Sequence, residues 1–140
     1  MSFDWEDFST LAGELLETAD SSEVPDAAIR AAVGRTYYAL FGLATDMLKA
    51  RKEEIPRQSA HATVRRLLGE SANPIERNIG VTLVELFRYR VMADYELSPS
   101  VPLTLELAKH CQLVGRSAVA ALQAMTDEAS GEPDQPPGRP

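Results

Sequence analysis

The chain has 140 residues and a formal net charge of −7 at pH 7, with 44% hydrophobic and 25% charged residues. This length and composition suit one globular domain with a substantial core. The acidic excess argues against a general nucleic-acid binder, because such binding grows with the number of phosphates neutralised. The single cysteine, Cys111, excludes an intrachain disulfide. No apolar run approaches the length of a membrane span and the acidic N-terminus lacks signal-peptide features, so we expect a cytoplasmic protein without membrane association.

The first predicted helix spans residues 4–19. Its apolar side chains recur at helical spacing, and its acidic residues gather near the start, where the helix dipole favours them. The aromatic residues Phe3, Trp5 and Phe8 are expected to dock this helix onto the rest of the chain. The following turn, residues 20–24, carries Asp and Ser side chains suited to capping the next helix.

Residues 25–52 are predicted to form a long central helix around which the chain is organised. The stretch begins with a proline, contains no proline inside, and carries two neighbouring stripes that imply contacts on both sides. Arg30 and Arg35 lie within this apolar run, and a buried arginine needs a carboxylate or several acceptors. We therefore expect partners for both arginines elsewhere in the chain. The apolar stripe comprises Ile29, Val33, Tyr37, Leu40, Phe41, Ala44 and Leu48, and the small-residue stripe comprises Ala27, Ala31, Gly34, Tyr38 and Gly42.

Three further helices are predicted after a break at residues 53–58. Ser59 is the expected cap of the first of them, and no strand-like alternation or internal repeat is present. Residues 1–127 are thus predicted to form an all-α, four- to five-helix up-and-down bundle. Residues 128–140, rich in Pro, Gly and acidic residues, are predicted to be a disordered tail. The three helices span residues 60–70, 75–95 and 103–127.

The basic residues are concentrated in the middle of the chain. Residues 49–90 hold 9 basic and 5 acidic side chains, whereas residues 1–48 hold 2 basic and 9 acidic ones. Two interpretations remain open: a local basic surface that binds nucleic acid, or a solvated face of mixed charge.

Three local motifs resemble those of the HEPN superfamily. The central helix reads RTYYALF at residues 35–41, the third predicted helix starts with SAH at 59–61, and the fourth ends with RVMADY at 90–95. Small HEPN proteins carry an Arg-x-Tyr-Tyr-Ala-x-Phe helix, a Ser/Thr-x-His helix start and a closing Arg-x-x-Ala-Asp-Tyr. The resemblance covers residues 5–125, nearly all of the predicted domain.

This resemblance implies a helical bundle that forms a homodimer with a shared cleft. Many family members are metal-independent RNA endonucleases, and many are toxins in toxin–antitoxin or phage-defence systems. Others are modified and silenced by a partner nucleotidyltransferase. The partners implied for this chain are therefore a second copy, RNA, and a cognate antitoxin or nucleotidyltransferase.

The chain departs from the family pattern at the active site. Active members carry an arginine followed four to six residues later by a histidine, but no histidine follows Arg88 or Arg90 at that distance. Asp94 and Tyr95 stand at those positions instead. His110 lies on the next helix, and His61, on the preceding helix, could supply an imidazole to this site.

RNA cleavage without a metal needs a general base, a general acid and a cation for the phosphorane charge. Arginine suits the last role, and histidine suits proton transfer near neutral pH. Aspartate is a weak proton donor at that pH and tyrosine a weak base. The candidate catalytic residues are Arg90, Asp94, Tyr95 and His61, and the candidate RNA- or nucleotide-binding residues are Arg88, Arg65, Arg66, Arg35 and Tyr38.

Each candidate also has a purely structural interpretation. Arg90 and Asp94 are four residues apart and could form an ion pair within one helix, or Asp94 could reach Arg30 or Arg35 and hold two helices together. The tyrosines could serve helix packing, the histidine could be a first-turn or core residue, and the arginines of 57–66 could be solvated.

Two functional hypotheses follow from these motifs. One is a HEPN-type toxin or defence effector that cleaves RNA; the other is a HEPN-like binding module without catalysis, favoured by the missing histidine and the net acidity. No metal or cofactor is expected. His61 and His110 lack the Glu three residues earlier that di-metal bundles use, and no glycine-rich phosphate loop precedes a helix.

Overall fold

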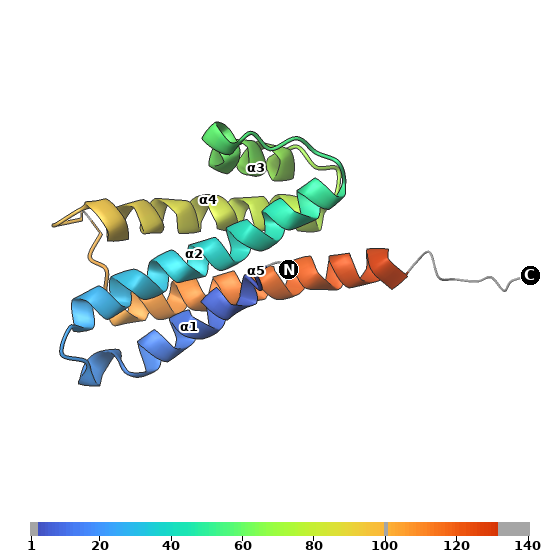
Figure 1. Ribbon diagram of the computed structural model, residues 1–140. Coiled ribbons are helices and arrows are strands. Elements are labelled where there is room, and N and C mark those ends of the chain that lie inside the picture. Colours follow the sequence, from blue (N-terminus) through green and yellow to red (C-terminus); the bar gives the residue numbers. More distant parts are fainter. Residues whose placement is uncertain (1–2, 100, 132–140) are drawn as a thin grey trace, which may run out of the picture.

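The computed structural model describes residues 3–99 and 101–131 (Figure 1). Within these residues the chain is all-α, as predicted, and five α-helices pack as a bundle. Two single 3-10 turns, Ala19–Ser21 and Arg57–Ser59, precede the second and third helices. The helices are α1 (Glu6–Glu17), α2 (Pro25–Ala50), α3 (Ala60–Gly69), α4 (Pro74–Tyr95) and α5 (Leu105–Gly131).

Helix α2 is the centre of the bundle, as the sequence predicts. It packs against α1, α4 and α5 and also touches α3 (Figure 1). Helix α3 lies mainly on α4, on the side of the bundle away from α1, so that α1 and α3 cover opposite sides of the other three helices. This arrangement gives α2 two buried faces, which explains why its sequence carries two apolar stripes.

The core consists of two clusters of buried side chains. The larger lies between α2, α3, α4 and α5 and includes the fully buried Tyr37, Leu40 and Leu83. The smaller lies where α1 meets α2 and α5 and includes Leu16 and Val33. Burying one such large apolar side chain contributes about 1.5–3 kcal/mol, so these clusters supply the main favourable term for folding.

The small-residue stripe of α2 is buried only in part. Gly42 receives the indole ring of Trp5, and a methyl group added at Gly42 would overlap that ring. Ala27 and Ala31 are exposed, so no described helix packs closely there. The aromatic docking of α1 agrees with the prediction at two residues, because Trp5 packs on Gly42 and the ring centroid of Phe8 lies 4.9 Å from the guanidinium carbon of Arg35, both on α2.

The helix ends correct two of our predictions. The hydroxyl of Ser59 lies 3.4 Å from that of Thr63 instead of capping α3. Ser22, in the turn expected to cap α2, accepts the backbone N–H of Val24 within the turn itself. Side-chain caps are present at two other helix starts: Asn73 accepts the N–H of Ile75 at 2.8 Å at the start of α4, and Thr104 accepts the N–H of Leu107 at 3.0 Å at the start of α5.

Helix α5 extends further than predicted. It continues to Gly131, so residues 128–131, assigned to the disordered tail, are helical. Residues 132–140, the rest of that predicted tail, lie outside the described residues. In the part of the chain that the structure describes, none of the helices has the length and apolar character needed to cross a bilayer.

Candidate functional site

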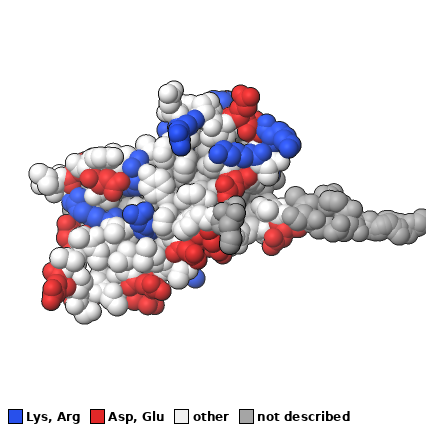
Figure 2. Space-filling model, viewed as in Figure 1, with Lys and Arg blue, Asp and Glu red and all other residues white. Residues whose placement is uncertain are grey.

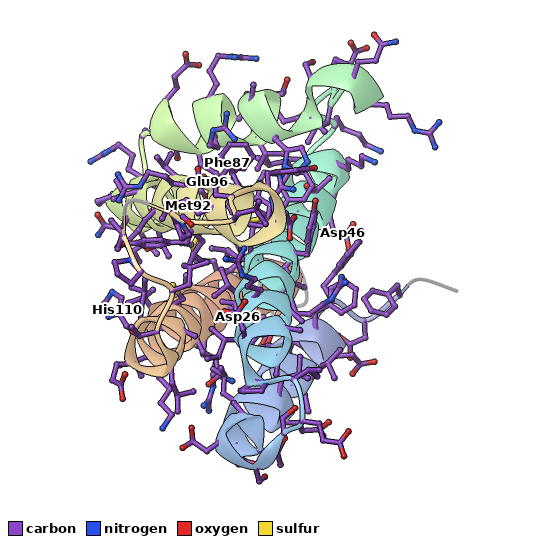
Figure 3. All side chains as sticks on the ribbon, turned by 90° about the vertical axis from the view of Figure 1, so that its left-hand side faces the viewer. Asp26, Asp46, Phe87, Met92, Glu96 and His110 are labelled. Atoms are coloured by element: carbon purple, nitrogen blue, oxygen red, sulfur yellow. The ribbon has the colours of Figure 1, made fainter. Side chains whose placement is uncertain are left out.

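The structure brings the motifs on α2, α3 and α4 together in one cluster. Tyr37 and Tyr38 from α2, His61 from the first turn of α3, and Phe87 and Arg90 from α4 are mutual neighbours. Figure 3 labels Phe87 in the layer between α3 and α4. Helical spacing places Phe87 and Arg90, three residues apart, on one face of α4, whereas the adjacent tyrosines of α2 point in different directions, Tyr37 into the core and Tyr38 toward its edge.

His61 is held in a fixed orientation by two contacts. Its Nδ1 atom lies 2.6 Å from the hydroxyl of Tyr37, and its ring stacks on Phe41 with centroids 4.3 Å apart and an angle of 14° between planes. Tyr37 is fully buried, whereas His61 and Phe41 are half-buried. The imidazole therefore stands at the edge of the core, with Nδ1 bound inside. Its Nε2 makes no hydrogen bond to any residue that the structure describes.

Arg90 is the most buried charged residue of the cluster and is only 9% exposed. Its guanidinium carbon lies 5.2–5.6 Å from the ring centroids of Tyr37, Tyr38 and Phe87. One of its nitrogens donates to the carboxylate of Asp94 at 3.2 Å, and its buried Nε has no partner among the described residues. Burial lowers the pKa of Arg90, but Tyr38, Asp94 and Tyr95 together outweigh it, so the pKa is raised and the side chain stays charged.

Arg65, on α3, approaches the same cluster from the opposite side. Its guanidinium carbon lies 4.3 Å from the ring centroid of Phe87, the shortest such contact in the described chain. Its Nη1 atom is buried and, like Nε of Arg90, has no partner within residues 3–99 and 101–131. Two guanidinium groups thus share one aromatic ring, and each keeps an unused donor. Buried donors of this kind are costly unless a ligand or water completes them.

The electrostatics of the cluster keep both titratable rings neutral. Burial, followed by the charges of Arg90 and Arg65, lowers the pKa of His61 below its ordinary value of 6.5. Burial raises the pKa of Tyr37 and outweighs the opposing influence of the same two arginines. The cluster therefore carries a net positive charge at neutral pH that comes from the guanidinium groups alone.

Of the predicted site residues, six lie in or beside the cluster. Arg90, His61, Arg65 and Tyr38 are within it, Asp94 pairs with Arg90, and the exposed Tyr95 contributes to raising the pKa of Arg90. The remaining three lie elsewhere. Arg88 covers Tyr89, Arg66 pairs with Glu70 on the surface, and Arg35 covers Phe8 of α1.

Three members of the cluster were not among the predicted site residues: Tyr37, Phe41 and Phe87. The signal for them was nevertheless present, because Phe87 precedes Arg90 by three residues and Phe41 follows Tyr37 by four. These spacings place each pair on one helix face. What the sequence did not supply was the position of α3, which brings His61 against that face.

The surface around the cluster differs in charge from the opposite side of the molecule. In Figure 2, Asp and Glu dominate the surface over α1, whereas Lys and Arg gather over α3 and the neighbouring parts of α2 and α4. This distribution follows the sequence, in which the basic residues are concentrated in the middle segment. Across residues 3–99 and 101–131, His, Cys, Asp and Glu side chains form no group of three that could hold a metal ion.

The fold and the cluster define an all-helical, five-helix protein, counted over the described residues, with an arginine–aromatic–histidine site between its second, third and fourth helices. No protein-family model, curated protein or solved structure matches the chain.

Proposed function

We propose that this protein is a HEPN-type effector that acts on RNA as a metal-independent endoribonuclease. The observation that supports this proposal is the convergence of His61 from α3 with Arg90 from α4, which offers an imidazole and a guanidinium in one cluster. In the family pattern both groups come from one helix. In this chain His61 takes the place of the histidine that the fourth helix lacks.

The proposed reaction is an internal transfer at one phosphodiester. The 2′-oxygen loses its proton to solvent water and bonds to phosphorus, the bond from phosphorus to the 5′-oxygen breaks, and that oxygen takes up a proton from water. The products are a 2′,3′-cyclic phosphate and a 5′-hydroxyl. Arg90 and Arg65 suit the phosphate, because their guanidinium charges beside His61 can stabilise the charge that grows on its oxygens.

The Arg90–Asp94 ion pair is compatible with this role. It occupies one nitrogen of a guanidinium that carries five N–H donors, and Asp94 is 40% exposed on its side chain. The ion pair therefore orients Arg90 but does not occupy all of its N–H donors. The resemblance further implies a homodimer that gathers Arg90, Asp94 and Tyr95 of both copies in a shared cleft, with an antitoxin or nucleotidyltransferase as a regulatory partner.

The experiment is an RNA cleavage assay on the purified full chain with two matched variants. Arg90→Ala should abolish cleavage, and Arg88→Ala should retain it, because the exposed Arg88 covers Tyr89 outside the cluster. Circular dichroism should show the same helix content for both variants. Loss of folding in Arg90→Ala would support a structural role, and cleavage by folded Arg90→Ala would contradict the proposal.

A second candidate function is a HEPN-like binding module that holds RNA, a nucleotide or a partner protein without cleaving. The observation that favours it is the fixed hydrogen bond between His61 and the buried Tyr37, which occupies one of the two imidazole nitrogens. This candidate predicts stoichiometric binding without RNA turnover, even at high protein concentration. Cleavage that is lost in Arg90→Ala but not in Arg88→Ala would exclude it.

A further inference from the structure

We infer that Tyr37 is a positioning residue that holds His61 as the neutral tautomer with its proton on Nε2, so that His61 meets an RNA phosphate as a hydrogen-bond donor. The inference rests on the proposed function, because it names the role of one residue in that site. It follows from counting which groups around the Tyr37 hydroxyl can donate and which can accept.

The hydroxyl of Tyr37 has one described acceptor within reach. The side chain is fully buried, and its oxygen lies 2.6 Å from Nδ1 of His61. The charged groups nearest to it are Arg65 and Arg90, and guanidinium groups can donate hydrogen bonds but cannot accept them. A buried phenol that left its proton unused would lose the free energy of a hydrogen bond. The proton of Tyr37 is therefore directed to Nδ1 of His61.

The consequence for His61 concerns its second nitrogen. When Nδ1 of a neutral imidazole accepts a hydrogen bond, Nε2 must carry the proton. Protonation to imidazolium would place a proton on Nδ1 and break this arrangement. Burial and the charges of Arg65 and Arg90 oppose the same protonation, so three effects act in one direction. His61 then offers an N–H near the positive charges of the two arginines.

This arrangement makes three polar side-chain atoms of the cluster hydrogen-bond donors. Nε2–H of His61, Nη1 of Arg65 and Nε of Arg90 are donors, and none of them makes a hydrogen bond within the described chain. The N–H of the half-buried His61 suits an oxygen of a phosphate, whose negative charge increases during cleavage. The two arginine nitrogens are buried, and their guanidinium groups add positive charge near the imidazole. His61 does not accept the proton of the 2′-hydroxyl in this arrangement, because its one basic nitrogen is occupied.

The test is a measurement of the His61 tautomer by two-bond ¹H–¹⁵N correlation NMR on the ¹⁵N-labelled full chain at pH 7. We expect the pattern of an Nε2–H imidazole in the wild type. Tyr37→Phe should shift the ring nitrogens toward a mixture of tautomers, since the phenol that selects one of them is gone. Tyr38→Phe is the matched control, because its ring lies 6.1 Å from that of His61 without a hydrogen bond to it, and it should leave the pattern unchanged.

Binding of a 2′-deoxy oligonucleotide, which cannot be cleaved, supplies the second measurement. Tyr37→Phe should weaken it about tenfold, the loss expected for one well-oriented hydrogen bond to an anion, and Tyr38→Phe should weaken it less. An Nδ1–H tautomer or an imidazolium in the wild type at pH 7 would overturn the inference, even if Tyr37→Phe failed to fold. An unchanged tautomer in folded Tyr37→Phe would also overturn it. An Nε2–H tautomer in a chain that neither binds nor cleaves RNA would overturn the proposed function alone.

Discussion

Two regions along α4 each contain an arginine with an aspartate four residues away, and the two arginines make different contacts. At the C-terminal end of α4, Arg30 from α2 donates to the backbone carbonyl oxygens of Ala93 and Glu96 at 3.0 and 2.7 Å. It also donates to its own neighbour Asp26 at 3.0 Å. Figure 3 labels Asp26 and Glu96, which belong to this end of the bundle. In the cluster nearer the middle of α4, Arg90 lies over aromatic rings and keeps a buried Nε unused.

The difference separates an arginine whose donors are satisfied within the fold from one that keeps a donor without a partner among the described residues. The carbonyl groups at the end of a helix lack intrahelical partners, and Arg30 supplies donors to them where the helix dipole favours positive charge. Its charge and its donors are thereby satisfied within the fold. Arg90 is charged and nearly buried but incompletely bonded, which costs stability.

The largest effect expected from this comparison is on activity, at Arg90. Arg90→Lys keeps the charge but removes the planar fork, so cleavage or RNA binding should fall by about 100-fold or more, as for loss of one donor to a developing oxyanion. The midpoint of thermal unfolding should change little. Single-turnover RNA cleavage measures the first quantity and calorimetry the second. Arg30→Lys is the control, and equal losses of activity in both variants would remove the distinction.

The next largest effect is on stability, at Arg30. Arg30→Ala leaves the carbonyl groups at the end of α4 without donors, so the free energy of unfolding should fall by about 2 kcal/mol. Urea denaturation measures this change, and RNA cleavage per folded molecule should stay close to that of the wild type. A loss of cleavage without a loss of stability would show that Arg30 also serves the site.

The two aspartates allow a smaller and closely matched test. Asp26→Ala and Asp94→Ala each remove a carboxylate four residues from an arginine, and because both carboxylates are exposed, each ion pair contributes about 0.5 kcal/mol. Both variants should therefore lose similarly little stability in urea denaturation. Only Asp94→Ala should alter RNA cleavage, because only Asp94 orients the arginine of the cluster. A large loss of stability in Asp94→Ala would instead indicate the structural role.

The smallest expected effect is a dependence of stability on pH through His61. Burial and the charges of Arg90 and Arg65 hold its pKa in the folded state below the 6.5 of the unfolded chain. The unfolded chain thus binds a proton more readily, so His61 favours folding fully above pH 6.5, and this contribution is lost as the pH falls below 6.5. Urea denaturation at pH 7.5 and 5.5 should show a smaller loss in His61→Gln than in the wild type. An equal loss would mean that His61 does not contribute.

The sequence alone determined that the chain is helical and that its central helix is packed on two faces. The apolar periodicity of residues 25–52 required a central helix with two contact faces, and α2 has them. Helix boundaries were less determined, because a cap depends on local hydrogen bonds, as Ser59 and Asn73 show. Of the candidate site, the sequence indicated Arg90, His61 and Tyr38 as separate residues, from motifs and chemistry.

Only the tertiary structure decided how these residues meet. The packing of α3 on α4 places His61 against Tyr37, although 24 positions separate them in the chain. The same packing brings Arg65 to the ring that Arg90 already contacts. Whether an arginine finds carbonyl oxygens or aromatic faces depends on which helix end lies opposite it. Long-range packing sets which helix end lies there, and the spacing of apolar residues along the sequence does not reveal it.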